Sequence, residues 1–95
     1  MAQDKAAEML RNLVSFLRAR SWNDSRRILD EHPELLYSAA SDMLAIMIQD
    51  PQTTAMVYPG LSQAKRDPLL REHLGLLRRC REVGVGRAFA ELEGR

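Results

Sequence analysis

The stretch that decides the fold is LLREHLGLLRRCREVGVGRAFAEL, residues 69–92. Placed on a helix, its apolar residues cover about half of the circumference, and charged residues take the other side. The apolar side consists of Leu69, Leu70, His73, Leu74, Leu76, Leu77, Cys80 and Val83. We therefore predict a helix over residues 69–83 that buries one face.

The Gly-Val-Gly at residues 84–86 suits a junction between two helices. Nucleotide-binding loops place their glycines between a strand and a helix, and they continue with a third glycine or a Gly-Lys-Ser/Thr sequence, neither of which is present here. We expect Gly84 to end the long helix with a positive φ, and Val85 to pack back on the last turn. Ala88, Phe89 and Leu92 then predict a short terminal helix.

The sequence before residue 69 also predicts short helices. Ser21 is a helix cap, with Asp24 three residues later as its expected partner in a capping box. Pro33 suits the first position of a helical turn. A further cap is expected at Ser41. The predicted helices and helical turns cover residues 4–20, 22–31, 34–37 and 43–49.

Residues 50–68 contain three of the four prolines and Gly60, so we predict a connector with isolated turns there. The resulting fold class is all-α, a compact bundle of four to five short helices in a single domain over residues 1–95. The helices near 5–20, 43–49 and 69–83 are expected to form the core.

Composition excludes several classes of protein. The 14 basic and 13 acidic residues give a net charge of +1, so no overall field attracts a polyanion. The single cysteine excludes an intramolecular disulfide and favours a reducing compartment. No apolar run reaches the roughly 18–20 residues of a membrane span, and the first residues do not resemble a leader peptide. We expect a cytoplasmic protein without a membrane-bound part.

No set of residues predicts catalysis or a cofactor. Cys80 is on the apolar side near a helix C-terminus, which favours a buried structural thiol over a nucleophile. The only histidines, His32 and His73, lack a metal-binding spacing. We therefore expect no enzyme activity, no metal and no cofactor, with a small pocket around Cys80 and His73 as the remaining enzymatic alternative.

A partner surface is the functional feature that the sequence offers. Tryptophan beside arginine is the usual composition of an interaction hot spot, although Trp22 also suits a buried anchor for its helix. The arginine clusters are interspersed with acidic residues, which favours a salt-bridged surface over a nucleic-acid site. The candidate surface consists of Trp22, Arg26, Arg27, Arg71, Arg78 and Arg79.

Two blocks, FLRARSWNDSRRILDEHPELL (residues 16–36) and HLGLLRRCREVGVGRAFAEL (residues 73–92), carry a resemblance. They resemble a short helical region of bacterial multidomain proteins that combine tetratricopeptide repeats with caspase-like CHAT domains. The resemblance covers 41 of 95 residues and implies a scaffolding or partner-binding role without catalytic residues. This chain departs from that pattern by having no repeats, no protease domain and a proline-rich middle.

These observations predict a non-enzymatic protein–protein interaction or scaffolding module, with another protein or a second copy of the chain as its partner. The alternative is a small nucleic-acid or anionic-ligand binding protein that uses Arg26, Arg27, Arg78 and Arg79. A nucleic-acid partner is the less favoured of the two, because the acidic residues divide the arginines.

Overall fold

Seven helical segments follow one another with few residues between them. The computed structural model describes residues 2–94 and the side chains of residues 5–94. The segments are α1 (Ala2–Leu17), α2 (Trp22–Glu31), the 3-10 helix η1 (Pro33–Leu36), α3 (Ser38–Ile48), α4 (Pro51–Val57), α5 (Gln63–Val83) and α6 (Val85–Glu93). No strand occurs within residues 2–94. The all-α prediction is confirmed, with six α-helices in place of the expected four to five.

Side-chain caps begin two of the helices. The Ser21 hydroxyl accepts the backbone N–H of Asp24 at 3.1 Å, which confirms the predicted start of α2. The Asp24 carboxylate bonds Arg27 rather than returning to Ser21, so the capping box is only half formed. Asp50 caps α4 by accepting the backbone N–H of Gln52 at 3.1 Å. Pro51 occupies the first turn of α4, where a missing N–H costs little.

The connector predicted over residues 50–68 is wrong in its extent. It contains all of α4 and the first six residues of α5, which begins at Gln63 rather than after Pro68. A proline at the sixth position removes one hydrogen bond, that to the carbonyl of Ala64. Ala64 is exposed, so its carbonyl group is open to hydrogen bonding by solvent. The loss therefore falls on one surface peptide and does not stop the helix.

The helix predicted at residues 43–49 also begins earlier than expected. α3 starts at Ser38, and Ser41 lies inside it, with its hydroxyl donating to the Ser38 carbonyl oxygen at 3.0 Å. Ser41 is buried and therefore needs this bond. The prediction of a helix cap at Ser41 is therefore wrong, because its hydroxyl bonds a carbonyl group within α3.

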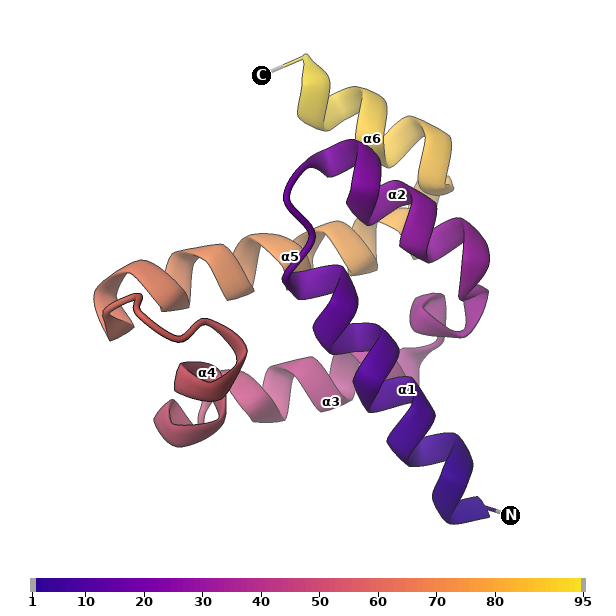
Figure 1. Ribbon diagram of the computed structural model, residues 1–95. Helices are drawn as coiled ribbons and strands as arrows, with labels where there is room; N and C mark the ends of the chain where they lie inside the picture. The colour runs from indigo at the N-terminus through magenta and orange to yellow at the C-terminus, as the bar shows by residue number, and fades with distance from the viewer. Residues whose placement is uncertain (1, 95) are drawn as a thin grey trace.

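The helices cross in an open arrangement around one core (Figure 1). α3 and α5 run roughly antiparallel and contact each other, and α4 packs against one end of both. α1 crosses this pair and contacts α2, η1 and α3. α6 folds back on α5 and also contacts α2. The Cα radius of gyration, 12.9 Å, is close to the roughly 12–13 Å of a compact chain of this length.

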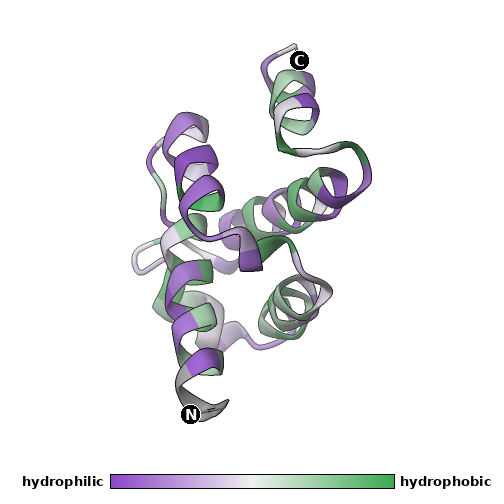
Figure 2. Ribbon diagram, turned by 90° about the vertical axis from the view of Figure 1, so that its right-hand side faces the viewer, coloured by the Kyte–Doolittle hydropathy of each residue, from purple (hydrophilic) through white to green (hydrophobic). Residues whose placement is uncertain are grey.

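The core comes from the three predicted helices, together with residues from the other segments. It includes Leu13 and Phe16 of α1, Leu44 of α3 and Leu77 of α5, each with no exposed surface. The apolar run of α3 contacts η1, α4, α5 and α1, which confirms the expectation that it meets several neighbours. Figure 2 shows apolar colouring around much of α3. Its Ile46 nevertheless remains 72% exposed.

Gly84 alone separates α5 from α6. Its φ of 93° confirms the predicted positive value, but its ψ of 155° lies outside the left-handed helical region expected of a helix-ending glycine. Its N–H donates to the Cys80 carbonyl oxygen and its carbonyl oxygen accepts the Ala88 N–H, so one residue serves both helices. α6 therefore begins at Val85, three residues before the predicted terminal helix.

Candidate functional site: the α5–α6 groove

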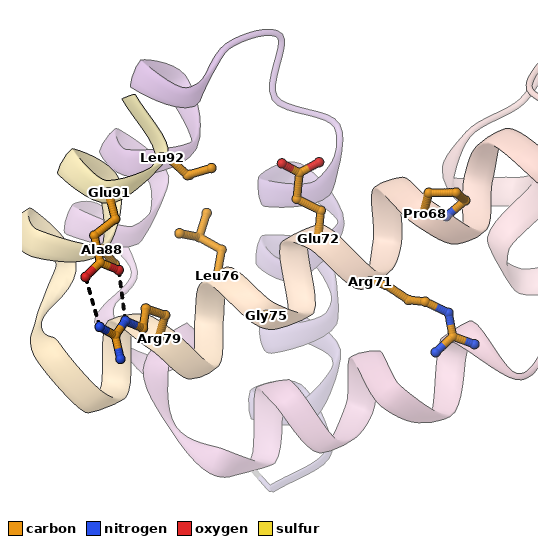
Figure 3. Close-up of a pocket in the computed structure, with 9 residues that line it drawn as sticks. All are labelled: Pro68, Arg71, Glu72, Gly75, Leu76, Arg79, Ala88, Glu91 and Leu92. Carbon is orange, nitrogen blue, oxygen red and sulfur yellow. Dashed lines mark hydrogen bonds and ion pairs between the residues drawn. The ribbon is translucent and has the colours of Figure 1, made fainter. Parts of the chain in front are cut away.

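A groove of about 670 Å³ runs along α5 where α6 folds back on it. We call it the α5–α6 groove; its lining residues are Pro68, Arg71, Glu72, Gly75, Leu76, Arg79, Ala88, Glu91 and Leu92. Figure 3 shows the side chains of Glu72, Leu76 and Leu92 pointing into the same space. Its volume is within the range of about 300–1,000 Å³ that is typical of ligand sites.

An ion-pair network fixes one end of this groove. Nε and Nη2 of Arg79 donate to the two carboxylate oxygens of Glu91 at 2.8 and 2.9 Å, and Nη1 donates to Glu82 at 3.1 Å. These bonds lower the pKa of Glu91 and raise that of Arg79. Arg87 approaches Glu91 at 3.6 Å. The bidentate pair ties α5 to α6 and holds the groove wall in place.

The remaining lining combines apolar groups with charges of both signs. Leu76 and Ala88 are buried and Leu92 is partly exposed, so the floor is apolar. Two arginines and two glutamates sum to no net charge. The Arg71 side chain extends away from Leu76 and Leu92 (Figure 3). A polyanion would therefore meet no positive field in this groove.

Gly75 is the lining residue that the fold itself does not explain. It lies in the middle of α5, where glycine costs roughly 0.5–1 kcal/mol relative to alanine. Its φ is not positive, and an added Cβ would meet no atom within 4 Å. A Cβ added at Gly86, by contrast, would lie 3.7 Å from Nη2 of Arg26. Neither backbone conformation nor internal packing therefore requires a glycine at position 75.

The structure does not bring the predicted partner surface together. Arg71 and Arg79 line the α5–α6 groove, whereas Trp22 lines a different cavity and is partly buried. Arg27 is paired with Asp24 at 3.1 Å. The two others, Arg26 and Arg78, are exposed and line none of the cavities described. The prediction thus identified part of one wall of the groove.

Sequence reasoning missed the apolar floor of the groove. Leu76 was assigned to the core, and Ala88 and Leu92 to a terminal helix that folds back. Their joint role depends on the angle at which α6 leaves Gly84, which residue spacing does not specify. The available signal was Gly75, a glycine in the middle of an otherwise strong helix.

Cys80 is buried, as predicted. Its side chain is 3% exposed, and desolvation raises the pKa of the thiol to about 11. Attack by sulfur requires the thiolate, which such an environment disfavours. Burial therefore disfavours Cys80 as the nucleophile of a pocket shared with His73.

His73 is on the apolar side of α5, as predicted, and is only 4% exposed. Its Nδ1 donates to the Leu69 carbonyl oxygen at 2.8 Å. Its ring meets Phe16 edge-on and Trp22 at a tilt, with centroids 5.2 and 5.0 Å apart. Desolvation lowers the pKa of His73, although the Leu69 carbonyl and Glu72 oppose this effect.

Acidification should therefore destabilise the protein through His73. In the unfolded chain this group binds a proton near pH 6.5, whereas the folded chain resists protonation to lower pH. Its contribution to stability is present above pH ~6.5 and is lost as the pH falls through the folded value. Urea unfolding at a series of pH values should show a steeper loss for the wild type than for His73→Phe. If the free energy of unfolding fell equally with pH in the two proteins, this assignment of the pH dependence to His73 would be contradicted.

The two most exposed large apolar side chains lie outside the described cavities. Ile46 and Met56 are 72% and 79% exposed, on α3 and α4 respectively, and neither lines a described cavity. Isolated exposed residues of this kind are common on soluble proteins. Among the described residues, no group of three or more His, Cys, Asp or Glu side chains is placed to hold a metal ion. None of the described helices is both long and apolar enough to cross a membrane.

Comparisons with protein-family models, with curated proteins and with solved structures found no match to this chain.

Proposed function

We propose that this protein is a non-enzymatic interaction module that binds an amphipathic helical segment of a partner protein in the α5–α6 groove. The observation that carries the proposal is the groove itself, with an apolar floor at Leu76, Ala88 and Leu92 between charged walls. Amphipathic helices bind such grooves through apolar anchors spaced one turn apart.

The charges in the groove favour a partner segment that carries both signs. Glu72 faces the same space as Leu76 and Leu92, and the Arg79–Glu91 pair closes the opposite wall. A segment with basic and acidic residues beside its apolar stripe complements this arrangement. Complementary charges of this kind select the partner more than they add affinity.

An arginine-based nucleic-acid site has less support. Two of its four residues, Arg27 and Arg79, already pair with carboxylates in the folded chain. Phosphate contacts would have to compete with Asp24, Glu82 and Glu91 for these guanidinium groups. The resemblance of residues 16–36 and 73–92 to helical regions of repeat-containing bacterial proteins also favours a protein partner.

We place this activity in the bacterial cytoplasm. The single, buried cysteine suits a reducing compartment, and the resemblance is to bacterial chains. A second copy of the chain is the alternative occupant of the groove, and it would produce a homo-oligomer.

Filling the groove should abolish partner binding without disturbing the fold. Gly75 lines the groove, so the Gly75→Phe side chain would project into it, and Cβ at this position has no atom within 4 Å apart from its own stretch of helix backbone. Affinity capture from a lysate of the source organism should recover a protein with the wild type, and at least tenfold less of it with Gly75→Phe, a loss of at least ~1.4 kcal/mol.

The matched control is Ala90→Phe, which adds the same ring to an exposed position of α6 that does not line the groove. It should retain the partner. Circular dichroism should show equal helix content for all three proteins. Equal recovery with Gly75→Phe, or recovery of nucleic acid that nuclease treatment removes, would contradict the proposal.

A further inference from the structure

A second site lies on another side of α5, where two smaller cavities meet at His73. The Tyr58 cavity, of about 280 Å³, lies between the end of α1, Tyr58 and Leu69. The Trp22 cavity, of about 230 Å³, lies beside the start of α2. Both are lined by Ala19, Leu69 and His73, and neither shares a residue with the α5–α6 groove.

The second ring nitrogen of His73, Nε2, is an acceptor to which no described residue donates. The residue is only 4% exposed, and its Nδ1 must carry the proton because it bonds the Leu69 carbonyl oxygen. Nε2 then presents a lone pair, and no described residue donates to it. No side-chain nitrogen or oxygen of the described residues is both fully enclosed and unpartnered, so Nε2 keeps some accessible surface. The two cavities that His73 lines are the open space beside it.

The cavity walls are suited to a flat apolar group. The Trp22 ring packs at a tilt against the His73 ring, and Leu69 lines both cavities. The Tyr58 hydroxyl already donates to the Leu17 carbonyl oxygen at 2.6 Å, so Tyr58 offers mainly its ring. Desolvation keeps His73 neutral at pH 7, which preserves its lone pair. Both volumes lie below the roughly 300–1,000 Å³ of sites for drug-sized ligands, so each cavity suits a small group such as one ring.

Each cavity also has an arginine in its lining. Arg18 lines the Tyr58 cavity and Arg20 the Trp22 cavity. Both are exposed, and neither side chain forms an ion pair or hydrogen bond with a described residue. An anionic group at the cavity mouth would therefore find a guanidinium that no carboxylate occupies.

We propose that the His73 cavities bind a small aromatic acid with a ring hydroxyl or N–H group. The donor bonds Nε2 of His73, the ring packs against Trp22 or Tyr58 beside Leu69, and the carboxylate pairs with Arg18 or Arg20. This site is independent of the α5–α6 groove, and Gly75→Phe should leave it intact.

Calorimetric titration at neutral pH with matched probes tests this proposal. Para-hydroxyphenylacetate contains the ring, the donor and the anion. Phenylacetate lacks the donor, and para-hydroxyphenethylamine replaces the anion with a cation. We expect measurable binding of the first probe, and about tenfold weaker binding of each of the others, because each leaves one polar group of the site unpaired.

Variants separate the two contacts. His73→Phe should remove the preference for para-hydroxyphenylacetate over phenylacetate. The double change Arg18→Gln and Arg20→Gln alters only exposed residues, so it preserves the fold, and it should weaken both acids about tenfold. Arg78→Gln is the matched control, since Arg78 is an exposed arginine that lines neither cavity, and it should bind like the wild type. Absence of binding by para-hydroxyphenylacetate, or equal binding of all three probes to the wild type, would overturn the proposal.

Discussion

Leu77→Ala is expected to lower the free energy of unfolding by about 3–5 kcal/mol. Leu77 has no exposed surface and belongs to the core cluster that α5 shares with its neighbours. Truncation removes buried apolar surface and leaves a cavity that the surrounding helices only partly fill. A domain of this size has a total stability of only about 5–15 kcal/mol, so a large fraction of it would be lost.

Urea denaturation followed by circular dichroism measures this change. The midpoint should fall while the slope of the transition stays constant, because both proteins expose similar surface on unfolding. Ile46→Ala is the matched control, since Ile46 is also an aliphatic helix residue but is 72% exposed. It should change stability by less than about 0.5 kcal/mol. Similar losses for the two variants would show that α5 is not in the core.

Gly84→Val is expected to destabilise the protein by about 2–3 kcal/mol, for a different reason. At a φ of 93° and a ψ of 155° the backbone occupies a region that is open essentially to glycine alone. A Cβ at Gly84 would meet no other atom within 4 Å, so the cost is conformational rather than a clash with neighbours. The substituted residue must either accept this strain or change the angle between α5 and α6.

The matched control compares alanine substitutions at Gly84, between the two helices, and at Gly75, inside α5. Gly84→Ala should be destabilising, whereas Gly75→Ala should stabilise by roughly 0.5–1 kcal/mol because position 75 is an ordinary helix interior. Thermal and urea unfolding of both variants would show whether each substitution raises or lowers the free energy of unfolding. The same sign for both changes would contradict the conformational explanation for Gly84.

Local signals in the sequence predicted those parts of the fold that depend on few residues. The Ser21 cap gave the start of α2, and Gly84 gave the end of α5 together with the sign of its φ. Both act through bonds and torsions within four residues of their own position. The apolar periodicity of residues 69–83 similarly predicted a buried face, because the helical period fixes which side chains share a side.

The proline-rich middle could not be predicted in the same way. Pro68 disfavours a helix locally, yet α5 continues through it, since only one exposed carbonyl loses its partner. Tertiary contacts of α5 with α3, α4 and α6 compensate for that local cost. The sum of these contacts is a property of the assembled bundle rather than of residues 50–68.

The candidate site was predictable only in part, for a related reason. Arg71 and Arg79 were recognised as surface residues, but the floor of the groove needs α6 to return over Leu76. The direction of that return depends on the ψ of Gly84 and on the Arg79–Glu91 pair, 12 residues apart. Spacing along one helix contains no information on either.

Photo-crosslinking within cells of the source organism tests the central claim most directly, namely that the α5–α6 groove binds a helical segment of another protein. A photoreactive residue in place of Glu72 lies in the groove, and one in place of the exposed Ile46 lies outside it. We predict that position 72 forms an adduct with one protein, mapped by mass spectrometry to a single amphipathic segment, and that position 46 does not. Equal adducts from both positions, or adducts from position 46 alone, would contradict the claim.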